Sequence, residues 1–227
     1  PGSEGEVLHT MTQPNIVGVT MFASDWNVEV ILDEMAVAAQ NGECNALIDT
    51  GALITGFSNL EVAAYLLGHK KTRDGRTHPE LPDNVEGCVF IDEDGAKMIL
   101  LRHSKEVVKL ADSGIPTQRR FAFYDQVHTT GMDIQHNLDA TAALTLGKDM
   151  TWRDYAQGAY RMRGIGRGQK ITLYMIPEVR ELIVKDLASA KVPGPADWAV
   201  NISTVLNSVA IWLFCNSVRS ERIQYSM

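Results

Sequence analysis

The segment FYDQVHTTGMDI, residues 123–134, places a carboxylate and an imidazole directly after a strand-like apolar run. Asp125 and His128 form an Asp-x-x-His pair, and Asp133 closes a turn that contains threonine and glycine. A histidine beside a carboxylate can transfer protons or bind a metal ion. Both roles need a nucleophile or further ligands nearby, and the segment has none. We therefore interpret the pair as a brace for the turn, with catalysis as the alternative.

An aspartate at the end of a strand also occurs in the acidic box of ATPases, where it orients magnesium and a following glutamate activates water. Here the following residue is Gln126, which cannot act as a general base. The chain also contains no G-x-x-x-x-G-K-[ST] phosphate loop. We expect no ATP hydrolysis by this chain alone.

The segment QGAYRMRGIGRG contains a second group of residues that could bind a ligand or take part in catalysis, namely its arginines. Gln157 and Arg161 are spaced i, i+4 and share one helix face, while Arg163 and Arg167 lie at the glycine-rich end. An arginine presented across an interface can stabilise phosphate charge and raise a rate by about 10³–10⁵. The alternative is a glycine helix stop with solvated arginines.

The order of these motifs resembles the second RecA-like lobe of superfamily-two helicases and translocases. HTTGMDI is similar to the motif that couples nucleotide to nucleic acid, AALTLG to the next strand, and YAQGAYRMRGIGRGQKITLYMI to the arginine helix and its strand. The resemblance implies that the arginine helix faces a nucleotide held by a phosphate-loop domain elsewhere, which would bring ATP and magnesium. It implies a coupling turn of Asp125, His128, Thr129, Thr130, Gly131 and Asp133, and nucleotide-facing Gln157, Arg161, Arg163 and Arg167.

Residues 46–177 also resemble the C-terminal region of a family of very large eukaryotic proteins of unknown function, often labelled ubiquitinyl hydrolase. The similar segments are ALIDTGALITGFSNLEVAAYLL, GCVFIDEDGAKMILLR, RFAFYDQVHTTGMDI and ALTLGKDMTWRDYAQGAYRMRGIGRGQ. This resemblance implies a larger protein that carries the phosphate-loop domain as the partner of this chain. The label implies a thiol peptidase with ubiquitin as a partner.

Two alternative catalytic sites follow from other residues. A thiol hydrolase would need Cys44 beside His128, although Cys44, Cys88 and Cys215 all have the apolar neighbours of core cysteines. The segment ALIDTGA has the form of a retropepsin-like aspartic protease, with Asp49 as the catalytic carboxylate. The helical segments that follow argue against an all-β protease and favour a strand-to-helix turn.

The composition limits the partners and the compartment. The chain has 227 residues, 45% of them hydrophobic, and a net charge of −7, so an extensive nucleic-acid interface is not supported. Three cysteines without zinc-ligand spacing predict no metal site and favour a reducing, cytoplasmic compartment. No apolar run is long enough for a membrane span. We interpret residues 1–5 as a vector-derived tail.

Strand and helix patterns alternate along the chain, which predicts an α/β fold. We expect a RecA-like parallel sheet with helices on both faces over residues 6–180, and a C-terminal helical extension over 181–227. Predicted strands lie within 44–54, 120–126, 140–147 and 170–177, with a hairpin at 87–102. One predicted helix begins at Ser24 or Asp25. Further helices are predicted over 58–68, 104–114 and 151–164, and one long helix is predicted over 196–225.

Overall fold

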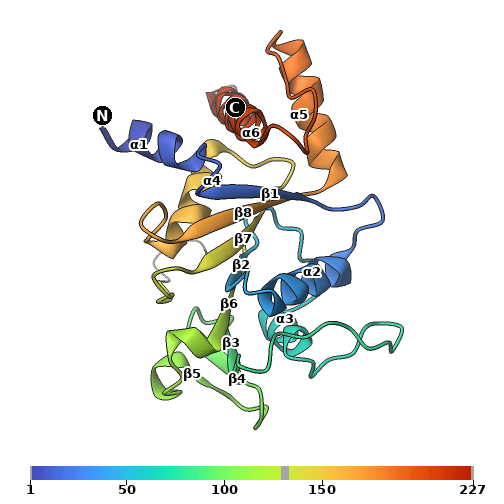
Figure 1. Cartoon of the computed structure of the whole chain (residues 1–227), viewed down its shortest axis with the longest axis vertical. Coiled ribbons are helices and arrows are strands. Elements are labelled where there is room, and N and C mark those ends of the chain that lie inside the picture. Colours follow the sequence, from blue (N-terminus) through green and yellow to red (C-terminus); the bar gives the residue numbers. More distant parts are fainter. Residues whose placement is uncertain (1, 129–132, 226–227) are drawn as a thin grey trace.

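A mostly parallel sheet forms the centre of the protein in a computed structural model that describes residues 2–128 and 133–225. Its eight strands have the spatial order β1-β8-β7-β2-β6-β3-β4-β5 (Figure 1). The first six in that order run parallel, and β4 and β5 add an antiparallel meander. The strands are β1 Val17–Met21, β2 Ala46–Ile48, β3 Gly87–Ile91, β4 Lys97–Leu101, β5 Val107–Lys109, β6 Arg120–Tyr124, β7 Thr141–Thr145 and β8 Lys170–Met175.

Helices cover both faces of this sheet. Helices α2 (Val28–Gln40) and α3 (Asn59–Leu66) lie on one face, and α4 (Trp152–Ala159) lies on the other (Figure 1). Because the central strands are buried on both sides, they are continuously apolar, as in the fully buried GCVFI of β3. The predicted α/β class, with its mainly parallel sheet and helices on both faces, is confirmed.

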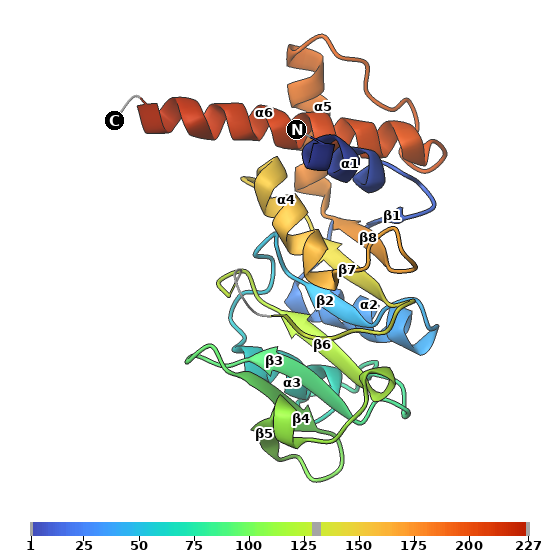
Figure 2. The same cartoon turned by 90° about the vertical axis from the view of Figure 1, so that its left-hand side faces the viewer.

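Three further helices gather at the β1 end of the sheet. They are α1 (Gly2–Met11), α5 (Pro177–Ser189) and α6 (Ile202–Tyr225). The predicted C-terminal helix is confirmed as α6, which packs on α4 and α5 and extends beyond the body of the protein (Figure 2). Its buried side includes Val205, Val209 and Trp212.

Several predicted boundaries differ from the structure. The interpretation of residues 1–5 as a tail meets a helix, α1, and the predicted domain boundary at 180 falls inside α5. The predicted helix at 104–114 is wrong, since Val107–Lys109 is strand β5 and only a short 3-10 turn, Leu110–Asp112, follows. Pairing of β5 with β4 overrides the helical spacing, and valine suits a strand.

Helix α2 begins later in the chain than its predicted caps. The predicted caps, Ser24 and Asp25, lie before the helix, and Asn27 is the N-cap because its side chain accepts a hydrogen bond from the Val30 amide at 3.0 Å. We expect Asn27→Ala to lower the free energy of unfolding by about 1 kcal/mol and Ser24→Ala to leave it within about 0.5 kcal/mol. Urea denaturation of both variants checks this, and the reverse ranking would contradict it.

Candidate functional site

The carboxyl ends of β2 and β7 define a topological switch point. From β2 the chain passes through α3 to β3, toward the β5 edge of the sheet. From β7 it passes through α4 to β8, toward the β1 edge. Helices α3 and α4 cover opposite faces of the sheet (Figure 1), and a crevice lined by the loops after β2 and β7 lies at the two strand ends. Ligands of open α/β sheets bind in such crevices.

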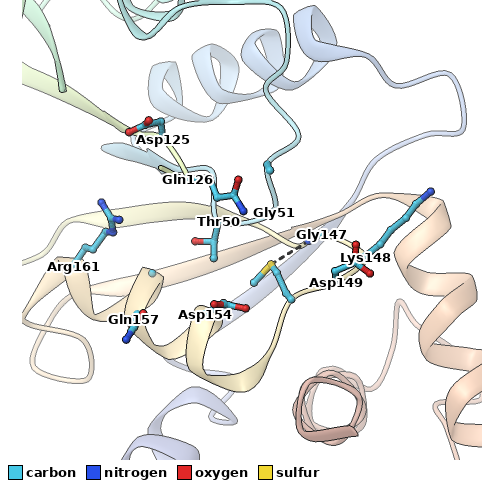
Figure 3. Close-up of a pocket in the computed structure, with 13 residues that line it drawn as sticks. Thr50, Gly51, Asp125, Gln126, Gly147, Lys148, Asp149, Asp154, Gln157 and Arg161 are labelled. Atoms are coloured by element: carbon cyan, nitrogen blue, oxygen red, sulfur yellow. Dashed lines mark hydrogen bonds between the residues drawn. The ribbon is translucent and has the colours of Figure 1, made fainter. Parts of the chain in front are cut away.

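A polar pocket of about 260 Å³ occupies this crevice (Figure 3). Its walls are the loops that follow β2, β6 and β7, at residues 50–52, 125–126 and 147–150. The remaining wall is the α4 side, with Asp154, Gln157, Gly158 and Arg161. The pocket therefore brings together Asp125, Gln157 and Arg161, which the sequence analysis selected from two separate motifs.

Direct backbone contact closes the base of the crevice. A Cβ on Gly51 would lie 2.7 Å from the backbone nitrogen of Gly147, and a Cβ on Gly147 would overlap the Gly51 carbonyl. On the α4 side, a Cβ on Gly158 would overlap the Thr50 hydroxyl. The loops after β2 and β7 and helix α4 approach one another this closely because all three contact points are glycine.

Asp49 holds the loop after β2 in place. It is 3% exposed, and its carboxylate accepts hydrogen bonds from the amides of Leu53 (3.0 Å) and Ile54 (2.9 Å). The Thr145 hydroxyl donates to the same carboxylate at 2.6 Å and accepts a bond from the Gly51 amide at 3.0 Å. Asp49 therefore joins the ends of β2 and β7 through one buried network.

The same network contains Asp49 of the predicted aspartic-protease motif. Both oxygens of Asp49 are engaged by donors, and the sheet around it is parallel and helix-covered. Burial raises the pKa of Asp49, against the lowering effect of Thr145 and the two amides. The geometry gives Asp49 a structural position beneath the pocket.

The loop after β6 contains the predicted Asp–His pair. The His128 Nδ1 lies 2.9 Å and 3.0 Å from the two carboxylate oxygens of Asp125. The two side chains are 23% and 17% exposed, respectively. The predicted contact is therefore present, and it braces the exit of β6 at the edge of the pocket.

Arg161 reinforces the same loop from the opposite side. It lies in the 3-10 turn Tyr160–Met162 that continues α4, and it donates to the His128 carbonyl at 2.7 Å. Its guanidinium also stacks over the Tyr124 ring, 5.1 Å from the centroid. The residue is 8% exposed, so these contacts hold its guanidinium inside the protein at the wall of the pocket.

The guanidinium of Arg161 is incompletely paired. Its Nε and Nη1 are buried and have no hydrogen-bond acceptor among the residues that the structure describes. Burial lowers the pKa of Arg161, while Tyr124 and Asp125 act in the opposite direction. A buried cation with spare donors therefore lines the pocket.

The other residues of the two predicted motifs lie in different places. Gln157 is exposed and lines the pocket. Arg163 is exposed and pairs with Asp133 at 2.7 Å, and Arg167 is exposed on the following glycine-rich turn; neither of these arginines lines the pocket. The remaining members of the predicted coupling turn, Thr129, Thr130 and Gly131, lie outside the described residues.

The structure does not bring Cys44 and His128 together. Cys44 precedes β2, whereas His128 follows β6. Because these two strands are parallel neighbours, the residues lie at opposite ends of the strands. The Cys44 thiol is buried, donates to the Ala46 carbonyl at 3.2 Å, and has a pKa raised to about 12 by burial. A thiolate nucleophile needs the opposite environment.

Sequence reasoning missed two residues that shape the site. Thr145 bridges the two strand ends, and Lys148 lines the pocket in the loop after β7. Lys148 could have been found, because a polar GKD turn directly after a buried strand is a sequence signal. Thr145 has no such signal, since a threonine at the end of a strand is ordinary.

Comparison with known proteins adds no further assignment, because no family model, curated protein or solved structure matches the chain. Among the described residues, no group of three or more histidine, cysteine, aspartate or glutamate side chains could hold a metal ion. No helix in the described part of the chain has the length and apolar character to cross a membrane.

Proposed function

We propose that this chain is the second RecA-like lobe of a nucleotide-dependent protein, and that its switch-point pocket accepts the phosphates of a nucleotide held by another domain. The observation that carries this proposal is the buried guanidinium of Arg161 beside the pocket, because two of its nitrogens have no hydrogen-bond acceptor among the described residues. An unsatisfied buried polar group costs about 1–3 kcal/mol, and more when it is charged. A phosphate bound in the pocket would place negative charge and hydrogen-bond acceptors beside this cation.

The size of the pocket supports a site completed by a second domain. Its volume of about 260 Å³ lies below the roughly 300–1,000 Å³ of complete small-molecule sites. A nucleotide bound mainly by a phosphate-loop domain would need only this much space for its phosphates.

Magnesium fits this arrangement only in part. Asp125 lines the pocket, but the described residues offer no cluster of three acidic or imidazole ligands. Magnesium is commonly held by one or two carboxylates together with phosphate oxygens and water. Asp125, Asp149 and Asp154 are the pocket carboxylates that would contact the ion, which would neutralise phosphate charge beside them.

Binding of MgADP to the 227-residue chain tests the proposal. We expect weak binding, with a Kd on the order of 1 mM, and NMR shift changes confined to residues 50–52, 125–128 and 147–161. Replacing Arg161 with glutamine removes the spare donors and should weaken binding at least about tenfold. Thermal unfolding of each variant checks that it is folded.

Arg163→Gln is the matched control, because it removes the same charge two residues away and outside the pocket lining. We expect this variant to bind MgADP within about twofold of the unchanged chain, since exposed ion pairs contribute little. Equal losses in the two variants would mean that only net charge matters. Such a result, or an absence of shifts in the pocket loops at saturating nucleotide, would contradict the proposal.

A further inference from the structure

We propose that an apolar groove beside the pocket binds a peptide segment of a partner protein in which large apolar side chains alternate with lysine or arginine. The groove has a volume of about 520 Å³. Its apolar lining includes Leu60, Phe90, Met98, Val107 and Val127. It is distinct from the switch-point pocket, although Asp125 lines both.

The groove exists because the antiparallel strands extend the sheet beyond its helices. Phe90 of β3 is paired with Met98 of β4, and Leu100 of β4 with Val107 of β5. Since directly opposed residues share a face and side chains alternate along a strand, these residues all lie on one face. The first turn of α3, at Leu60, forms one wall, and the outer strands continue past it (Figure 1).

Three large apolar side chains around this concavity are exposed to solvent. Leu60 is 41% exposed, Val107 39% and Val127 79%. Single exposed apolar residues are common on protein surfaces and need no explanation. Three residues from α3, β5 and the loop after β6 that converge on one groove form a contiguous patch, which is typical of an interaction site.

The charges around the groove determine the kind of partner. Asp92 and Glu93, in the turn between β3 and β4, lie at its edge together with Asp125. Asp92 accepts bonds from the amides of Asp94 and Ala96, but neither Asp92 nor Glu93 forms an ion pair with a described residue. Such a rim attracts cationic groups and repels nucleic-acid phosphates.

A peptide with alternating apolar and basic residues satisfies both features. Leucine or phenylalanine side chains would cover the exposed floor at Val107 and Met98. The aliphatic stems of lysine or arginine would lie on the same apolar surface while their charged ends reach Asp92 and Glu93. A purely apolar ligand would leave Asp92 and Glu93 without a cationic partner.

Three synthetic peptides of equal length provide the test, with fluorescence anisotropy for affinity and NMR for location. In the first peptide, leucine and phenylalanine alternate with lysine and arginine; the second has glutamate in the basic positions, and the third has serine in the apolar positions. We expect the first to bind with a Kd on the order of 100 µM and the others at least about tenfold more weakly. NMR shifts should include Leu60, Met98 and Val107.

Variants at exposed positions separate the contribution of the apolar lining from that of the acidic rim without disturbing the core. Leu60→Ser and Glu93→Lys should each weaken binding of the first peptide at least about fivefold. Val184→Ser and Glu181→Lys, on exposed positions of α5, make the same chemical changes far from the groove and should leave binding within about twofold.

Two outcomes would overturn the docking groove. Equal effects of Glu93→Lys and Glu181→Lys would show only the attraction of a basic peptide to an acidic protein. Equal binding of the first and third peptides would show that the apolar floor is not used. Since Leu60 and Glu93 do not line the switch-point pocket, these results are independent of nucleotide binding.

Discussion

Replacing Asp49 with alanine is expected to lower the free energy of unfolding by about 3 kcal/mol, because it removes the acceptor of three buried hydrogen bonds. The amides of Leu53 and Ile54 and the hydroxyl of Thr145 would be left without their partner. The cost is smaller than three full bonds because the substitution also removes a desolvated carboxylate. Urea denaturation, with tryptophan fluorescence as the signal, measures the change.

Asp149→Ala is the control for this variant, because Asp149 is an exposed aspartate of the same crevice. Surface substitutions of this kind usually change stability by less than about 0.5 kcal/mol. A loss in Asp49→Ala no larger than in Asp149→Ala would contradict the structural role of Asp49.

The effect of Asp49 should also depend on pH, with a definite sign. Burial raises the pKa of Asp49 above its ordinary value, so the folded protein holds this proton more strongly than the unfolded chain does. The contribution of Asp49 to stability is therefore greatest below the unfolded pKa and falls as the pH rises through the folded one. We expect the stability difference between the unchanged protein and Asp49→Ala to shrink as the pH rises above the ordinary aspartate pKa of about 3.9.

Replacing Gly147 with alanine is expected to cost about 3 kcal/mol, because the added methyl group would overlap the backbone of Gly51. The obstacle is a main-chain carbonyl that cannot rotate away, so the loops after β2 and β7 must separate. This separation would also enlarge the base of the crevice. We therefore expect Gly147→Ala to lower both the stability and the affinity for MgADP.

Gly5→Ala provides a matched control, because a Cβ on Gly5 meets nothing within 4 Å. Gly5 lies inside α1, where alanine is favoured over glycine by about 0.5–1 kcal/mol. We expect Gly5→Ala to be neutral or slightly stabilising, which would also support a helix at residues that the sequence analysis interpreted as a tail. Equal stabilities for Gly147→Ala and the unchanged protein would refute the steric argument.

Local patterns were sufficient for most of the secondary structure. Helix α3 begins where Ser58 and Glu61 form a capping box, and the hairpin of β3 and β4 closes on the turn after Asp92. Both signals involve residues within a few positions of one another. Strand β5 was predicted as a helix because its pairing with β4 is not visible in its own residues.

The candidate site could be predicted only in part from the sequence. Asp125, Gln157 and Arg161 could be selected because they stand at recognisable positions in two motifs, and the structure places all three around one pocket. The burial of Arg161 could not be predicted, since its acceptor, the His128 carbonyl, is 33 positions away in the chain. Arg163, which has the same residue type and almost the same position, is exposed.

Alternating strand and helix patterns, caps and turns are local properties of the chain, and they were enough to predict the α/β class. The sequence also indicated that the acidic loop after β6 and the arginine helix contain residues capable of binding or catalysis. The position of β7 beside β2 is visible only in the folded chain, where it joins Asp49 to Thr145 across 96 residues and creates the crevice. Strand order depends on contacts between distant segments, and no local pattern encodes them.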